Sequence, residues 1–350
     1  MTLEETIGKI TPLDKEAMKS AQERWNSIAK PLHSLGMLEE LVIRIAGMTG
    51  SAAVDIGKKG LVAMCADNGV VAEGVTQCGQ EITAVVAEEF LEGNSTACKM
   101  CQHCGADLIP VDVGMAVDTK VRTDLKVAYG TRNFAKEPAM TREQAVRSIE
   151  AGIHMAEELA AQGYRMLATG EMGIGNTTTS SAMASVFLEQ APEIMTGRGA
   201  GLTSQGLEKK IQTIKNSIEL HRPDKEDPLD VLSKVGGFDI GGMAGVFLGG
   251  AALKLPVVMD GFISCVAALL AVRLCPAAAD YIIASHVSKE PAARLILEAL
   301  GKKALLHADM CLGEGTGAAA VFPVLDMAAM VYNTMSTFGD MQMESYQELK

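Results

Sequence analysis

The sequence between residues 167 and 179 reads Leu167-Ala168-Thr169-Gly170-Glu171-Met172-Gly173-Ile174-Gly175-Asn176-Thr177-Thr178-Thr179. This order of apolar, glycine and small polar residues predicts a buried strand, a tight turn and a helix that begins near Asn176. The free N–H groups and the positive dipole end of such a helix point outward together, which is how proteins commonly hold phosphate. The stretch therefore predicts a strand-to-helix unit with an anion site at its junction.

Two familiar phosphate-binding motifs do not fit this turn. A P-loop would continue into Gly-Lys-Ser/Thr, and a dinucleotide-binding turn would place a third glycine where Thr178 stands. An ordinary capped turn without a ligand remains the alternative. Glu171 favours a ligand site, because a carboxylate among these glycines would repel phosphate and is expected to face another part of a bound molecule.

The alternation of strand and helix extends along most of the chain. Residues 11–30, with Thr11 as the cap, and 35–48 have helical spacing, and no strand pattern appears before residue 60. Apolar runs then predict strands at 61–66, 108–113, 166–169, 257–259 and 281–284. Helices are predicted near 80–92, 94–104, 141–162, 176–189, 204–219, 262–273, 289–300 and 315–335. We expect an α/β fold with a doubly wound, mainly parallel, Rossmann-like sheet.

Composition excludes several classes of function. The net charge of −12 and an aromatic content of 4% provide neither the basic surface nor the stacking side chains of a nucleic-acid-binding protein. The apolar runs 240–253 and 261–272 are shorter than the roughly 20 residues that cross a bilayer, so they predict buried helices. No signal-peptide pattern opens the chain. We therefore expect a cytoplasmic protein that binds neither nucleic acid nor membrane.

Cys98, Cys101 and Cys104 form a C-x-x-C-x-x-C run beside His103, which raises the question of a metal site. The fourth cysteine of a ferredoxin pattern is missing, and no second C-x-x-C pair completes a zinc set. We favour a helix from about residue 94 to residue 103, capped by Asn94 or Ser95, with thiols packed against a sheet. A non-catalytic nucleotide-binding or metal-sensing module remains the alternative. Neither a metal nor a covalent nucleophile is expected.

Two more glycine-rich stretches follow the first. Residues 196–202 contain Arg198 and precede a helix with Lys210, which suits an anionic group, although such charges are often only solvated. Residues 311–320 place Glu314 between glycines at the start of an Ala-rich helix. Partial burial would raise the pKa of this carboxyl and favour a role as a base, whereas the helix dipole acts in the opposite direction.

Six motifs in order together resemble the nicotinate-nucleotide:5,6-dimethylbenzimidazole phosphoribosyltransferase family, from about residue 10 to residue 335. They are 66–70 with 73–75, 170–179, 197–199, 227–232, 260–262 and 312–315. The resemblance implies transfer of 5-phosphoribose from nicotinate mononucleotide to a benzimidazole, without a cofactor, in a homodimer. It also implies a small helical domain built from both chain ends, which we place at 1–55 plus 318–350, with a large Rossmann-like domain at 56–317.

The resemblance assigns roles to individual residues. Glu314 would be the base that deprotonates the acceptor. Separately from the resemblance, an acidic group near the ribose could stabilise positive charge there in the transition state, and Glu171 is the candidate. Phosphate and ribose would be bound by Gly173, Gly175, Asn176, Thr177, Gly199, Lys210, Asp260, Gly261 and Ser288. The acceptor would contact Gln80 and Leu312.

Departures from the family pattern cluster near the acceptor. Asn68 stands where many relatives have histidine, and the expected proline before Gln80 is absent. Phenol, cresol, adenine or other benzimidazoles therefore remain alternative acceptors. A nucleotide N-ribosyl hydrolase is the alternative activity.

Overall fold

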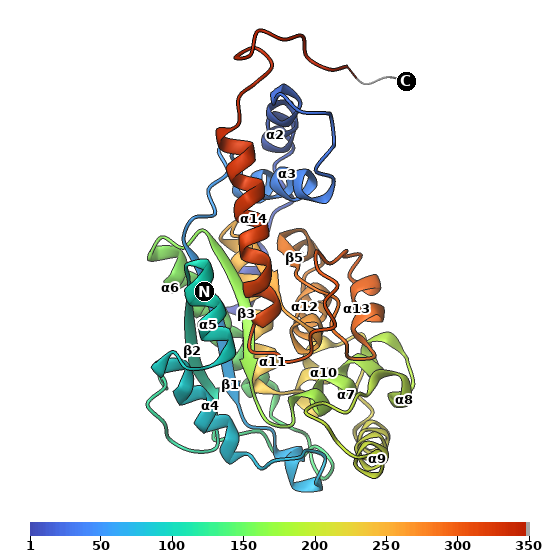
Figure 1. Cartoon of the computed structure of the whole chain (residues 1–350). Helices are drawn as coiled ribbons and strands as arrows, with labels where there is room; N and C mark the ends of the chain where they lie inside the picture. The colour runs from blue at the N-terminus through green and yellow to red at the C-terminus, as the bar shows by residue number, and fades with distance from the viewer. Residues whose placement is uncertain (348–350) are drawn as a thin grey trace.

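A five-stranded parallel sheet forms the centre of the computed structural model, which describes residues 1–347 (Figure 1). Its strands, in the spatial order β2-β1-β3-β4-β5, are β1 (Lys59–Ala66), β2 (Ala106–Gly114), β3 (Met166–Met172), β4 (Val257–Met259) and β5 (Ile282–Ala284). All eight residues of β1 are buried, as expected for a sheet covered on both faces. The predicted α/β class and the five predicted strands are confirmed.

Helices occupy most of the remaining chain. The α-helices are α1 (Leu3–Lys9), α2 (Lys15–Ser27), α3 (Met37–Thr49), α4 (Glu81–Glu92), α5 (Thr96–Cys104), α6 (Arg142–Ala161), α7 (Asn176–Leu188), α8 (Pro192–Met195), α9 (Ser204–His221), α10 (Pro228–Val235), α11 (Phe238–Ala252), α12 (Phe262–Leu274), α13 (Ala293–Ala299) and α14 (Thr316–Thr334). Two 3-10 segments, η1 (Gly69–Glu73) and η2 (Pro276–Tyr281), complete the order. No helix within residues 1–347 has the length and hydropathy needed to span a bilayer.

The helices form a layer on each face of the sheet. Figure 1 shows α4, α5 and α14 in front of the strands, whereas α6 and α11 pack together behind them. Helix α11 is buried almost throughout, which explains its uninterrupted apolar sequence. The strand order reverses between β1 and β3. In doubly wound sheets, ligands bind beyond the carboxyl ends of the strands near such a reversal.

Helices α2 and α3 lie with the carboxyl-terminal part of α14 beyond the sheet (Figure 1). The ring of Trp25 on α2 lies 5.1 Å from that of Tyr332 on α14, and Arg24 donates to the carbonyl of Met335 at 2.9 Å. Helix α1 instead packs on α6 and α11, with the terminal amine of Met1 2.7 Å from Glu157. The exact division into two domains stays a prediction.

The first long helix begins later than predicted. Asp14, not Thr11, is its cap, and the Asp14 carboxylate accepts the N–H groups of Glu16 and Ala17, both at 3.0 Å. An aspartate with two acceptor oxygens next to the first turn is a strong cap. Pro12 consequently lies before the helix, not in its first turn.

The cysteine-rich segment forms the predicted helix. Ser95 is the cap of α5 and accepts the N–H of Cys98 at 3.1 Å, while the side chains of Cys98 and Cys101 are buried. Within residues 1–347, no three His, Cys, Asp or Glu side chains are grouped so that they could hold a metal ion.

Candidate active site

A cavity of about 300 Å³ opens beyond the carboxyl ends of β3, β4 and β5. It brings together residues from several glycine-rich turns that lie far apart in the sequence. Of the predicted site residues, those that line it are Glu171, Gly173, Gly175, Asn176, Thr177, Gly199, Lys210, Asp260, Gly261, Ser288, Leu312 and Glu314. Gln80 does not line it. Its amide instead donates to the carbonyl of Asn68 at 3.1 Å, next to the start of α4.

One end of the cavity has the features of an anion site. Lys210, only 1% exposed, donates from Nζ to Thr177 Oγ1 at 2.7 Å. Burial lowers the pKa of Lys210 to about 8, so a bound anion would favour its charged form. Helices α7 and α12 both begin at this cavity after a glycine, and neither has a side-chain cap. Their first N–H groups are therefore suitable donors to phosphate.

Two buried carboxyl groups, of which Glu171 lines the cavity, meet at the side chain of Asn176. The Asn176 side-chain amide donates both to Glu171 and, at 3.1 Å, to Asp239. Burial raises the pKa of Glu171 to about 8, and the charge of Asp239 adds to this rise. Burial also raises the pKa of Asp239 to about 7. The pair therefore retains a proton near neutral pH until a positive charge arrives nearby.

Glu314 lies in a turn of unusual backbone conformation. Gly313, Glu314 and Gly315 have φ angles of 95°, 60° and 87°, all in the left-handed region. The Glu314 N–H donates to Glu171 Oε1 at 3.3 Å, and Glu314 Oε2 accepts the N–H of Ala97 in the first turn of α5, also at 3.3 Å.

Part of the cavity lining is apolar. It consists of Val75, Val86, Met172, Ile174 and Leu312. Leu312 is 57% exposed, so it forms part of the rim. An aromatic ring would fit against such apolar side chains.

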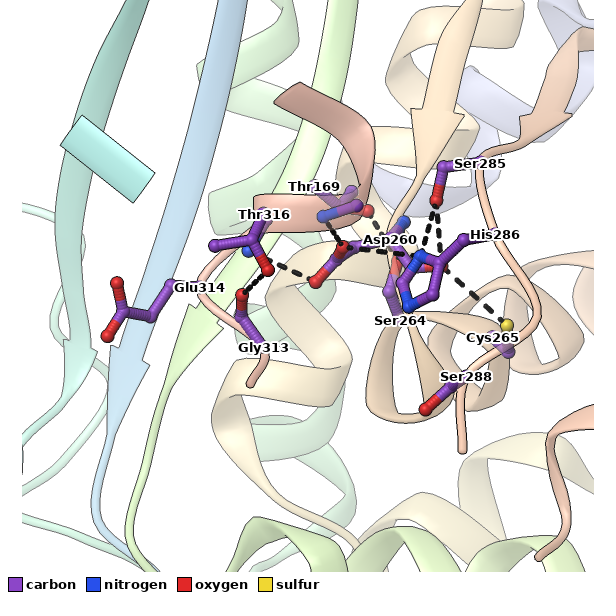
Figure 2. Close-up of polar contacts among 12 residues, drawn as sticks. Thr169, Asp260, Ser264, Cys265, Ser285, His286, Ser288, Gly313, Glu314 and Thr316 are labelled. Carbon is purple, nitrogen blue, oxygen red and sulfur yellow. Dashed lines mark hydrogen bonds and ion pairs between the residues drawn. The ribbon is translucent and has the colours of Figure 1, made fainter. Parts of the chain in front are cut away.

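Asp260 lines the cavity and also contacts the start of α14, while its predicted role in binding ribose or phosphate stays a prediction. Its Oδ1 accepts the N–H of Gly317 at 2.7 Å, and its Oδ2 accepts that of Gly315 at 3.1 Å. Figure 2 shows this carboxylate aimed at the start of α14, with His286 on its other side and the Glu314 side chain pointing away. Both oxygens of Asp260 are thus already used within the protein.

Sequence reasoning missed three ionisable residues near the cavity. They are Asp239, His286 and Glu290. Asp239 had one available signal, since it is the only carboxylate at the start of the otherwise apolar α11. The long segment 115–141, which lies between β2 and α6, contributes no residue to the lining of the cavity. Thr131 in this segment instead donates its N–H to the carbonyl of Asp67 at 3.0 Å and supports the loop after β1.

The site combines uncapped helix starts, a buried lysine and clustered carboxylates at the carboxyl ends of strands in a doubly wound sheet. These features are typical of an α/β enzyme that acts on a phosphorylated small molecule. The comparisons narrow this class, because a phosphoribosyltransferase family model matches residues 10–343. The chain belongs to this phosphoribosyltransferase family.

Known proteins resemble the chain over nearly its whole length. It is 47% identical over 345 residues to a nicotinate-nucleotide–dimethylbenzimidazole phosphoribosyltransferase from Acetivibrio thermocellus, with 98% of each chain covered. A protein of the same name from Ruminiclostridium cellulolyticum is 47% identical over 352 residues, with 100% of each covered. The crystal structure of CobT from Thermus thermophilus has a TM-score of 0.88 at 38% identity, covering 95% of this chain and 100% of that one.

Proposed function

We propose that this chain transfers 5-phosphoribose from nicotinate mononucleotide to 5,6-dimethylbenzimidazole, giving α-ribazole 5′-phosphate and nicotinate for cobalamin biosynthesis. The names of the relatives support these substrates. The single observation that carries the proposal is the position of Glu171 and Glu314. These two carboxylates lie in one cavity with an anion end around Lys210 and an apolar side around Leu312.

The anion end would bind the phosphate of the donor. Lys210 Nζ supplies a charged donor, and the starts of α7 and α12 supply backbone N–H groups. The dianionic phosphate raises the pKa of Lys210 from about 8, so that lysine becomes fully charged in the complex.

The ribose would lie next to Glu171. The pyridinium ring of nicotinate mononucleotide is cationic, and this charge lowers the pKa of Glu171 from about 8 toward ionisation. The bond between the anomeric carbon and the pyridinium nitrogen breaks, and its electron pair stays with the departing neutral ring. An ionised Glu171 stabilises the positive charge that then develops on the sugar.

The acceptor would approach from the apolar side with inversion at the anomeric carbon. One benzimidazole nitrogen forms the new bond, and Glu314 takes the proton from the other nitrogen. The left-handed turn holds Glu314 on the acceptor side, while its N–H contacts Glu171 at 3.3 Å. The proton later passes from Glu314 to solvent, so that the enzyme is restored.

The direct test is chromatography of nicotinate mononucleotide incubated with the protein. We expect free nicotinate and α-ribazole 5′-phosphate only when dimethylbenzimidazole is present. Nicotinate release at the same rate without an acceptor would instead indicate the nucleotide hydrolase. A panel of benzimidazoles, adenine, phenol and cresol under one condition ranks the acceptors, and we expect dimethylbenzimidazole to have the highest kcat/KM.

Glu314→Gln tests the assignment of the base. We expect turnover to fall by about 100-fold or more, which is the usual scale for loss of a general base. Glu92→Gln, which changes an exposed carboxylate at the end of α4, is the control and should keep wild-type turnover. Unchanged turnover of Glu314→Gln would remove Glu314 from the mechanism.

We further propose that the protein works as a cytoplasmic homodimer. Two large apolar side chains of α14, Met327 and Met330, are 58% and 66% exposed. Contiguous exposed apolar surface is typical of protein interfaces. Light scattering after gel filtration should give twice the chain mass, and Met330→Glu should shift the protein toward monomer. A monomeric wild-type protein would contradict this proposal.

A further inference from the structure

The helix that follows Glu314 lacks a cap of its own. Helix α14 begins after Gly315, and no side chain from its own N-terminal segment accepts its first N–H groups. Asp260, which follows β4, provides both acceptor oxygens instead, at 3.1 Å from the N–H of Gly315 and 2.7 Å from that of Gly317. A residue 55 positions away in the sequence therefore performs the task of the N-cap.

This contact lies next to the most strained part of the site. Glu314 has a φ of 60°, in a region that costs energy for a side chain with a Cβ, and it lies between two further left-handed residues. Such a turn persists only when its surroundings fix it. The bond from Gly315 to Asp260 immediately follows Glu314 and thereby fixes the carboxyl end of the turn.

Asp260 is itself firmly held. Its N–H donates to Ser264 Oγ at 3.1 Å, and Ser264 in turn lies 2.5 Å from Thr169 Oγ1 on β3. His286 Nδ1 lies 4.0 Å from Asp260 Oδ1 (Figure 2). Position 317 requires glycine, because a Cβ there would collide with the His286 ring and come within 2.7 Å of Asp260 Oδ1.

Opposing influences act on the charge of Asp260. Burial raises the pKa of its carboxyl, whereas His286 and the N–H groups of Gly261, Gly317 and Gly315 favour the charged form. A charged carboxylate can accept both helix N–H groups at once, and such charge-assisted bonds are among the strongest in proteins.

We propose that Asp260 is a positioning residue for Glu314: by capping α14 from across the site, it holds the 313–315 turn in the conformation that directs Glu314 to the acceptor. The proposal rests on the proposed function, in which Glu314 is the base. It differs from the prediction that Asp260 binds ribose or phosphate, because both of its oxygens already accept backbone N–H groups.

The test is a double-mutant cycle on kcat with Asp260→Asn and Glu314→Gln. The side-chain amide introduced by Asp260→Asn would offer one acceptor and one donor to two N–H groups, so the turn would lose one anchor. We expect Asp260→Asn alone to lower kcat by roughly 100-fold, the scale of a 1 Å misplacement of a reacting group. In the Glu314→Gln background, it should change kcat little, because there is no longer a base to position.

A binding measurement separates the two roles of Asp260. Calorimetry with nicotinate mononucleotide and no acceptor should give the same Kd for Asp260→Asn as for the wild type. A Kd weakened by tenfold or more, on the scale of one lost hydrogen bond to a charged group, would overturn the positioning role in favour of ribose binding. Equal losses of kcat in both backgrounds of the cycle would also overturn it.

Two further variants keep the test decisive. Asp112→Asn is the matched control, because Asp112 is a buried carboxylate that accepts the N–H of Met115 at 2.8 Å and does not line the cavity. It should leave kcat unchanged. Should Asp260→Asn fail to fold, Ser264→Ala takes its place in the cycle, because it removes the hydroxyl that accepts the N–H of Asp260 at 3.1 Å. Wild-type turnover of Glu314→Gln would overturn the proposed base, and this proposal with it, whereas additive losses would overturn the positioning role alone.

Discussion

Gly170→Ala should displace the catalytic turn without changing any polar group. Gly170 lies on β3, and a Cβ added there would be 2.7 Å from the carbonyl oxygen of Glu314 and 2.8 Å from Leu61 Cδ2. Ordinary van der Waals contact begins at 3.4 Å. The backbone of Glu314 would therefore have to move by about 0.7 Å, because the strand behind Gly170 is paired on both sides and buried.

The displacement has two measurable consequences. Overpacking of a buried site lowers the free energy of unfolding by about 1–3 kcal/mol. A reacting group moved by nearly 1 Å loses up to about 100-fold in rate. We expect kcat to fall by about 10-fold to 100-fold, with the Kd for nicotinate mononucleotide unchanged, since the anion end around Lys210 does not contact Gly170.

Steady-state kinetics and urea unfolding should be measured on the same preparations. Gly8→Ala is the control, because a Cβ at this α1 position would meet nothing within 4 Å, and it should leave both kcat and stability near wild type or slightly improve stability. A wild-type kcat in a destabilised Gly170→Ala protein would refute the reasoning. It would show that the rate does not depend on the position of the Glu314 turn.

Three more substitutions probe the carboxylate centre, the anion end and the acceptor rim. In the folded protein, the pKa of Glu171 is about 8 against an ordinary 4.5, so the stability it contributes is complete below about pH 4.5 and is lost as the pH rises through 8. Glu171→Gln cannot titrate, so urea unfolding should show the variant gaining stability relative to the wild type between about pH 4.5 and about pH 8, by several kcal/mol. Lys210→Met removes the phosphate donor, and calorimetry should give a Kd for nicotinate mononucleotide raised by about 10-fold to 150-fold; an unchanged Kd would exclude Lys210 from the phosphate site. Leu312→Ala changes a residue that is 57% exposed, so kinetics should show a higher KM for dimethylbenzimidazole with an unchanged KM for the donor and an unchanged melting temperature; equal rises in both KM values would contradict an acceptor-side role.

The features that could be predicted well from the sequence are those set by neighbouring residues along the chain. Each strand contains a short apolar run that is followed by glycine or small polar residues, whereas the longer apolar runs 240–253 and 261–272 lie in helices. The 167–179 stretch likewise forms β3, the turn and the start of α7. The predicted start of the first long helix was wrong, because Thr11-Pro12 and Asp14 are both plausible starts and tertiary contacts decide between them.

The contacts between distant turns could not be predicted. Asp260 was predicted to lie in the site. The N–H groups of Gly315 and Gly317 that it accepts, however, come from a turn that only the fold brings beside β4. Asp239 was missed for the same reason, because its bond to Asn176 joins the start of α11 to the start of α7. The resemblance to a family supplied residue roles, whereas the geometry shows which atoms are free to perform them.

Because Trp25 contacts Tyr332 on α14, the intrinsic tryptophan fluorescence of the protein depends on the surroundings of this helix. Trp25 is the single tryptophan of the chain, it is fully buried, and it lies against the carboxyl-terminal part of α14. The other end of this helix, about 28 Å away along its axis, begins at the Glu314 turn. A ligand that displaces α14 as a whole would change the surroundings of one native fluorophore, so tryptophan emission can report such a displacement in unlabelled enzyme.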